Sequence, residues 1–148
     1  MRHKLALALI LPILMACGAN SVAGQDTLSG ASCVGPYLDD QPRVGGRFGA
    51  SSPTVHPGDS ITVYGHWYAK SCNDSGGHDP IQPLPSVRLT LTLPDGRVQH
   101  LDRYTPTGPD FGFAATVRIP PKTAAGTAVV RDDRDPVRAT FTFTIGSA

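Results

Sequence analysis

The chain contains no glutamate, and its 148 residues include only three lysines, at positions 4, 70 and 122. Exposed helix faces are built mainly from glutamate, lysine, alanine and leucine, so the usual material for surface helices is missing. The charges nearly cancel, with 13 lysines and arginines against 12 acidic residues. No stretch is polybasic, and a near-neutral surface gives no electrostatic footprint for nucleic acid. The composition therefore argues against a helical protein and against a nucleic-acid partner.

Glycine and proline are abundant instead, with 16 and 14 residues spread along the chain without a period. The missing period excludes a collagen-like repeat, and the abundance of both residues favours short strands joined by many turns. The length suits one domain with one core of modest size. The sequence therefore predicts a small, turn-rich β-protein.

The amino terminus has the pattern of a secretory signal. Residues 1–4 are basic, residues 5–16 are apolar, and the apolar run is too short to span a membrane. The run ends in Leu14-Met15-Ala16-Cys17, which resembles the lipobox of bacterial lipoproteins. The resemblance implies that residues 1–16 are removed as a signal peptide and that Cys17 is lipidated. The protein would then be anchored to the cell membrane, on its extracytoplasmic face, through the lipid on Cys17.

Ordinary secretion is the alternative, because Ser21-Val22-Ala23 also offers small residues for a signal-peptidase cut. Residues 17–32 contain the cysteine and then small, polar residues of the kind found in flexible tethers. Residues 33–148 would form the folded body. We therefore expect three parts: a signal peptide, a tether and one domain.

The cysteine count fits export. The chain has three cysteines, and lipidation of Cys17 would leave Cys33 and Cys72 as a pair. In an oxidising compartment such a pair normally forms a disulfide, and a loop of about 40 residues would be closed with ~4 kcal/mol of stabilisation. A thiolate metal site or redox pair requires closer spacing, such as C-x-x-C, which the chain lacks. We therefore expect a structural disulfide between Cys33 and Cys72.

Apolar and polar residues alternate along the body with the period of two that predicts strands. Pro57-Gly58-Asp59 and Pro94-Asp95-Gly96 separate several of these segments and predict turns. Six or seven short antiparallel strands without helical periodicity argue for a two-layer β-sandwich. The expected strands cover residues 60–68, 87–93, 97–101, 111–119, 125–130 and 137–145, with a further short strand within residues 47–55.

The segment SPTVHPGDSITVYG, from Ser52 to Gly65, resembles the opening of bacterial immunoglobulin-like modules. These modules favour the pattern P-x-x-V-x-P-G-x-x-[IV]-x-V-x-G, and residues 111–130 resemble their later strands. The likeness covers about residues 47–146 and implies an all-β immunoglobulin-like antiparallel sandwich. It implies no activity, because such modules serve as adhesive, spacer and binding domains alike. The antibody-type spacing of Cys, Trp and Cys is absent, and no tyrosine corner is visible.

A candidate binding surface lies on the first long strand. Tyr64, His66 and Tyr68 alternate with the apolar row that ends at Trp67, so they would line one outer sheet surface. Tyrosine is favoured in recognition because it gives a large contact area at low entropy cost. His78 lies in the adjoining loop and joins the candidate binding residues. The alternative is that this surface packs under that loop.

A metal site and an enzyme are the other possibilities. His66 and His78 could approach each other and suit zinc or copper, but a site needs three or four ligands. The segment Cys72–Gly77 looks like the nucleophile motif of trypsin-like proteases, yet no matching histidine segment exists and the body is too small for a double barrel. We therefore expect no cofactor and no catalysis. The leading hypothesis is a lipid-anchored module that binds or spaces envelope proteins or glycans, with a metal-binding lipoprotein and a small extracellular hydrolase as alternatives.

Overall fold

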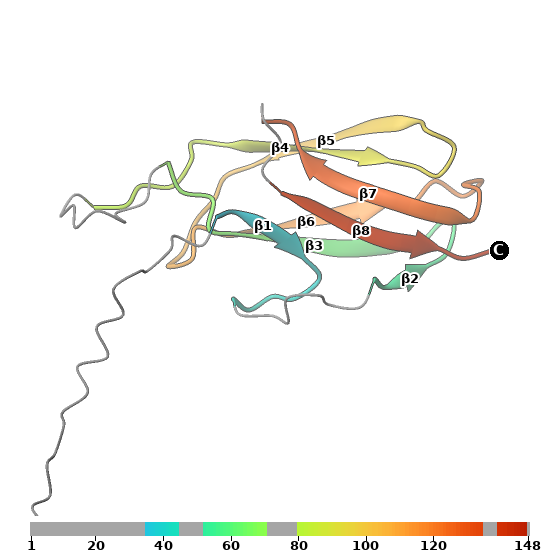
Figure 1. Ribbon diagram of the computed structural model, residues 1–148, viewed down its shortest axis with the longest axis horizontal. Coiled ribbons are helices and arrows are strands. Elements are labelled where there is room, and N and C mark those ends of the chain that lie inside the picture. Colours follow the sequence, from blue (N-terminus) through green and yellow to red (C-terminus); the bar gives the residue numbers. More distant parts are fainter. Residues whose placement is uncertain (1–34, 45–51, 71–79, 135–138, 148) are drawn as a thin grey trace, which may run out of the picture.

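The computed structural model describes residues 35–44, 52–70, 80–134 and 139–147, which form two packed β-sheets (Figure 1). These residues contain eight strands and no helix, as the composition predicts. In this part of the chain there is accordingly no helix that is long and apolar enough to cross a membrane. The predictions for Cys17, Cys33, Cys72 and His78 concern residues outside the described ranges.

The two sheets have three and five strands. The first has the order β1-β3-β6, and the second has the order β2-β8-β7-β4-β5. Every pair is antiparallel except β2 and β8, which run parallel. The strands are β1 (Tyr37–Asp39), β2 (Thr54–Val55), β3 (Ser60–His66), β4 (Val87–Thr92), β5 (Val98–Tyr104), β6 (Phe113–Arg118), β7 (Gly126–Asp132) and β8 (Thr140–Ile145).

This strand order is that of an immunoglobulin-like sandwich. Immunoglobulin domains place strands A, B, E and D in one sheet and C, F and G in the other. Here β3 and β6 take positions B and E, while β4, β7 and β8 take positions C, F and G. β5 extends the second sheet beside β4, as strand C′ does in variable domains, and the first strand is divided between β1 and β2. The predicted fold class is confirmed, with the three-residue β1 as an addition that the sequence pattern did not indicate.

The core lies between the sheets because alternate residues of each strand point inward. Every second residue of β4 and β8 is buried, in the regular pattern that the sequence predicts. The fully enclosed side chains come from both sheets, so neither sheet is stable as a separate layer. The largest apolar ones are Val63, Tyr68, Val87, Leu89, Leu91, Val117, Ile119, Val130, Phe143 and Ile145.

The alternation breaks after His66, where β3 ends two residues earlier than expected. Trp67 has a φ of 58°, in the left-handed region that side chains other than glycine rarely adopt. This turn of the backbone exchanges the directions of the next two side chains. Tyr68 is fully buried and Trp67 is partly exposed, so the predicted frame of inward Trp67 and outward Tyr68 is wrong.

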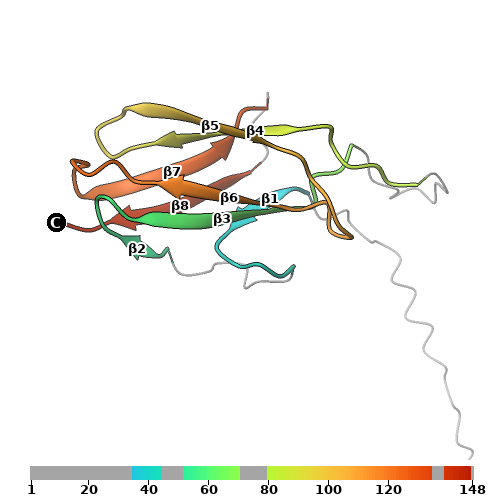
Figure 2. The same ribbon diagram turned by 180° about the vertical axis from the view of Figure 1, so that it is seen from behind.

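The sandwich has two ends that differ in structure (Figures 1 and 2). At one end the described chain begins, and longer connections gather there. We call this the loop end, and it comprises residues 35–37, 66–70, 80–86, 104–113 and 132–134. The other end holds the tight turns between strands. We call this the turn end, and it comprises residues 56–59, 93–98 and 119–125.

Candidate functional site

One largely enclosed polar cluster surrounds His66 at the loop end. His66 is the last residue of β3, and it pairs with Tyr37 of β1 on the outer side of the three-stranded sheet. The sequence frame therefore places it correctly on the outer side. Its side chain is nevertheless only 2% exposed. The prediction that it lies on an open surface is wrong, because two other segments of the chain cover the ring.

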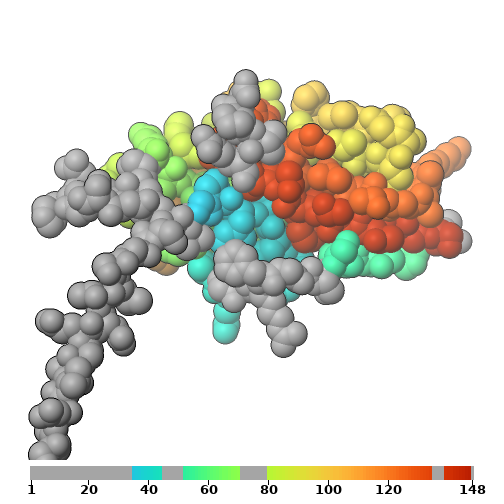
Figure 3. All heavy atoms as spheres, in the orientation of Figure 1, coloured from blue at the N-terminus to red at the C-terminus, as the bar shows by residue number. Residues whose placement is uncertain are grey.

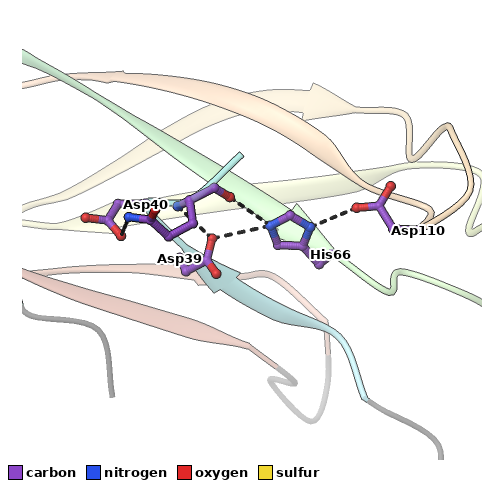
Figure 4. Close-up of polar contacts among 5 residues, drawn as sticks. Asp39, Asp40, His66 and Asp110 are labelled. Carbon is purple, nitrogen blue, oxygen red and sulfur yellow. Dashed lines mark hydrogen bonds and ion pairs between the residues drawn. The ribbon is translucent and has the colours of Figure 1, made fainter. Parts of the chain in front are cut away.

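The ring of His66 bridges segments that are far apart in the sequence (Figure 4). Its Nδ1 lies 2.8 Å from Oδ2 of Asp110, which belongs to the connection between β5 and β6. Its Nε2 lies 3.1 Å from the backbone oxygen of Gln41 and 3.3 Å from Oδ1 of Asp39. The ring of Tyr37 packs on the imidazole with centroids 4.9 Å apart. His66 thus joins β1 and the β5–β6 connection to the end of β3.

The segment that covers His66 is itself short. β1 lies at the surface of the sandwich and contacts β8 of the second sheet (Figure 3). Asp39 accepts a hydrogen bond from the backbone N–H of Gln41, at 2.9 Å, and this bond turns the chain after β1. The Gln41 carbonyl is thereby directed at the imidazole. Local turn chemistry and a distant histidine together fix β1 on the sandwich.

A histidine hydrogen-bonded to a carboxylate supplies two of the three members of a catalytic triad. In a triad, the second ring nitrogen of the histidine faces the nucleophile. In this cluster the second nitrogen faces a backbone carbonyl and Asp39 instead. Both nitrogens are therefore occupied by structural partners, and the ring is enclosed. The arrangement can clasp three segments together, but it offers no free base to a substrate.

The described residues do not contain a set of metal ligands. Among them there is no group of three or more histidine, cysteine or acidic side chains placed to hold an ion. His66 directs its two nitrogens at opposite carboxylates, Asp39 and Asp110, so these groups do not converge on one point (Figure 4). His78, the other proposed ligand, lies outside the described residues.

A second polar cluster, also at the loop end, lies inside the sandwich. Asp132, the last residue of β7, is fully buried. The Tyr68 hydroxyl donates to its Oδ2 at 3.5 Å, and Arg134 donates to the same oxygen through Nε at 3.1 Å and through Nη2. The Arg134 guanidinium also lies 5.0 Å from the centroid of the Tyr68 ring, a cation–π geometry. Burial, and next the negative charge of Asp132, raise the pKa of Tyr68 far above its ordinary value.

Aromatic packing connects this cluster to the sheet. Phe113 at the start of β6 lies between Tyr68 and Tyr104, with ring centroids 4.9 Å and 5.2 Å away. Gly65 of β3 makes room for this ring, because a Cβ at that position would overlap Phe113. The sequence does not predict these contacts. The signal for them was weak, since Gly65 reads only as part of the immunoglobulin-like pattern.

The predicted binding surface is therefore not present as one surface. Tyr68 is fully buried and His66 is nearly so, while Tyr64 alone of the three is partly exposed. The first cause is the positive φ of Trp67, which turns Tyr68 into the core. The second is the cover over His66. Both side chains serve packing within the domain.

A broad exposed surface does exist on the outer side of the five-stranded sheet. On β4, β7 and β8 its side chains are mostly threonine, with the partly exposed Val129 among them between Thr92 and Thr142. The two sides of the sheet differ as expected for an antiparallel sandwich. Arg131 is exposed and makes no ion pair with another described residue, whereas Arg88 lies 3.9 Å from Asp133. We call this surface the threonine face, and it comprises Arg88, Thr90, Thr92, Thr127, Arg131, Thr140, Thr142 and Thr144.

Comparison with known proteins adds little to this geometry. A scan against protein-family models finds no match, and a search of curated proteins finds none either. Among solved structures, the chain is similar to the one described as the RIG-5 IG1 homodimer, with 12% sequence identity and a TM-score of 0.39. That likeness covers 78% of this chain and 99% of the other. The assignment of the fold therefore rests on the strand order of the two sheets.

Proposed function

We propose that this protein is a non-catalytic envelope protein, anchored through a lipid on Cys17, whose immunoglobulin-like sandwich is a binding or spacer module. One observation carries the proposal. In the described part of the chain, His66 and Asp132 are buried, and each is paired within its own cluster. The outer surface of the five-stranded sheet, by contrast, stays exposed. This distribution suits recognition across a surface better than reaction within a site.

The threonine face is the part of the molecule best suited to recognition. Alternate residues along a strand stand about 7 Å apart, and neighbouring strands lie about 4.8 Å apart, so the hydroxyls form a regular array. Each threonine offers a donor, two acceptors and a methyl group. Thr140, Thr142 and Thr144 form one row of β8, and Thr127 and Arg131 belong to the adjacent strand. A hydroxyl-rich partner, such as an envelope glycan or a polar protein surface, matches this chemistry.

Site-specific photo-crosslinking in intact cells distinguishes binding from spacing. A photoreactive residue at Thr142 tests the threonine face. The same residue at Thr116 is the matched control, because Thr116 is also an exposed strand threonine but lies on the outer side of the other sheet. A binding module yields a discrete adduct from position 142 only. A spacer yields none from either position, and an adduct from position 116 alone contradicts the choice of face.

The anchor is tested by Cys17→Ala. Without the thiol there is no site for the lipid, so we expect the variant to leave the membrane fraction or to accumulate as an uncleaved precursor. The measurement is cell fractionation combined with labelling by an alkyne fatty acid, which should mark the wild-type protein and not the variant. Equal labelling and equal partitioning of both proteins would show that the anchor hypothesis is wrong.

A further inference from the structure

The loop end presents aromatic side chains on an unusual backbone. Trp67 and Phe111 have φ values of 58° and 47°, and both are partly exposed. Bulky residues rarely adopt such values, and where they do the surrounding structure holds them in place. Here the N–H of Trp67 donates to the carbonyl of Asp110 at 2.7 Å, and the N–H of Tyr68 donates to the carbonyl of Phe111 at 3.2 Å. These two bonds hold both aromatic residues together at the tip of the sandwich.

An exposed aliphatic residue joins them. Ile81 is 40% exposed and is one of three large apolar side chains that the described residues leave open to this degree. It belongs to a segment that runs beside the chain after Trp67: the N–H of Lys70 donates to the carbonyl of Gln82, and the N–H of Leu84 donates to that of Tyr68, each at 2.8 Å. The exposed Lys70 lies in the same ladder. The loop end therefore combines aromatic, aliphatic and cationic side chains.

The chain enters the sandwich at this same end. Tyr37 pairs with His66, the neighbour of Trp67, so Gly35 and everything before it connect to the loop end (Figures 1 and 2). Between Cys17 and Gly35 the chain can span at most about 60 Å. A lipid on Cys17 would therefore be connected to the sandwich through its loop end, and the turn end is the one farther from the point where the chain enters.

We infer that the loop end is a membrane-docking surface, on which Trp67, Phe111 and Ile81 contact the interfacial region of the lipid bilayer. Aromatic rings favour this region, and a lysine beside them can extend its charge to the headgroups. Apolar contact of this kind is weak alone but is strengthened when a lipid already holds the protein at the surface. The inference rests on the proposed anchor. With the loop end on the bilayer, the strands would run roughly perpendicular to the membrane. The threonine face would then point sideways, parallel to the membrane surface.

The chain contains a single tryptophan, so intrinsic fluorescence reports Trp67 alone. The lipid-modified protein is reconstituted into vesicles of phosphatidylcholine and phosphatidylglycerol, with and without lipids brominated on the acyl chains. We expect a blue shift of the emission and a loss of at least half of its intensity with the brominated lipids. The Cys17→Ala protein in solution gives the reference emission.

Matched variants test whether the quenching of Trp67 fluorescence depends on the apolar side chains of the loop end. Phe111→Asn removes the ring but tolerates a positive φ, and Ile81→Ser removes an exposed aliphatic group. Each should reduce the quenching about twofold. Val98→Ser is the control, because Val98 is 58% exposed but lies at the turn end, and it should leave the quenching unchanged. An equal effect of Val98→Ser and Ile81→Ser would overturn the assignment to the loop end.

A second arm separates docking from the anchor itself. The Cys17→Ala protein, with a histidine tag in place of the residues before position 17, is bound to vesicles that contain a nickel-chelating lipid. This attachment does not depend on natural lipidation. Quenching in this arm supports docking even if labelling shows that Cys17 carries no lipid. If Trp67 keeps its solution emission in both arms while the protein stays on the vesicles, the loop end does not dock on the bilayer.

Discussion

The two ends of the sandwich solve the same problem, reversing the chain between strands, by different means. At the turn end, glycines supply the positive φ values, 93° at Gly58 and 84° at Gly96, and neighbouring residues close the turns. At the loop end, Trp67 and Phe111 take positive φ values although they have large side chains. The turn end therefore depends mainly on local sequence, although backbone bonds also join Gly58 and Asp59 to Ile119. The loop end combines one local glycine turn, at Gly108 with a φ of 73°, with contacts between distant segments.

Buried polar groups follow the same division. His66, Asp39 and Asp132 are buried at or beside the loop end, and each is bonded to a group on another segment or beyond the strand end. At the turn end, the contact between His56 and Asp59 is exposed and close in sequence. The buried Thr123 hydroxyl likewise has a partner close in sequence, because it donates to the carbonyl of Pro120 at 2.8 Å. The difference predicts that polar substitutions destabilise the loop end much more than the turn end.

The strongest test of this comparison is Asp132→Ala. The substitution leaves the buried Tyr68 hydroxyl and the Arg134 guanidinium without their shared acceptor, and removal of one partner from a buried charged network is costly. We expect the free energy of unfolding to fall by about 3 kcal/mol in urea denaturation. Asp133→Ala is the matched control, since the ion pair of Asp133 with Arg88 is exposed, and its effect should stay within about 0.5 kcal/mol. Equal effects of the two substitutions would contradict a structural role for the buried cluster.

A smaller effect is expected for His66→Ala. The variant removes the ring that joins β1 and Asp110 to β3, so two carboxylates lose a buried partner. We expect a loss of about 2 kcal/mol and faster hydrogen exchange of the backbone amides of β1. His56→Ala at the turn end removes a histidine whose contact with Asp59 is exposed, and it should change neither quantity measurably. Unchanged exchange in β1 of the His66 variant would show that the clasp does not hold this strand.

The smallest change in stability is expected from substitutions at the residues with positive φ, glycine at the turn end and phenylalanine at the loop end. Gly96→Ala introduces a Cβ that meets no atom within 4 Å, so only the backbone conformation opposes it, and we expect a loss of about 1 kcal/mol. Phe111→Gly should be near neutral, because relief of the disfavoured φ offsets the loss of a partly exposed ring. Thermal denaturation of both variants measures the difference. A stabilising Gly96→Ala would contradict the division between the two ends.

The same division explains how much of the structure the sequence predicts. The turns at Pro57-Gly58-Asp59 and Pro94-Asp95-Gly96 are confirmed, because Asp95 and its neighbours act within the turn itself: the N–H of Arg97 donates to the Asp95 carboxylate at 3.1 Å. Alternation likewise predicts β4, β6 and β8, since those strands keep one side buried throughout. Local rules suffice wherever the contacts are local.

The contacts of the candidate site could not be predicted from local sequence. His66 is covered by Asp110, which is 44 positions away, and Tyr68 meets Asp132 across 64 positions. Nothing in the residues near His66 indicates either contact. The run from Arg131 to Asp135 mixes basic and acidic residues as a hairpin tip with compensating charges would, but Asp132 lies inside the sandwich. The sequence therefore predicts which side of β3 His66 occupies, and only the tertiary structure shows that this side is covered.

The parallel pairing of β2 with β8 gives the domain a mechanical property. The N–H of Thr144 donates to the carbonyl of Pro53 at 2.9 Å, and the N–H of Gly146 donates to that of Val55 at 2.8 Å. In a parallel pair, tension between the start of one strand and the end of the other pulls along the strands and loads both bonds together. An antiparallel hairpin pulled at its open end loses its bonds one after another. A sandwich pulled between the start of β2 and the end of β8 would thus resist the force by shear between these two strands, and its lifetime under load would depend on the rate of unfolding.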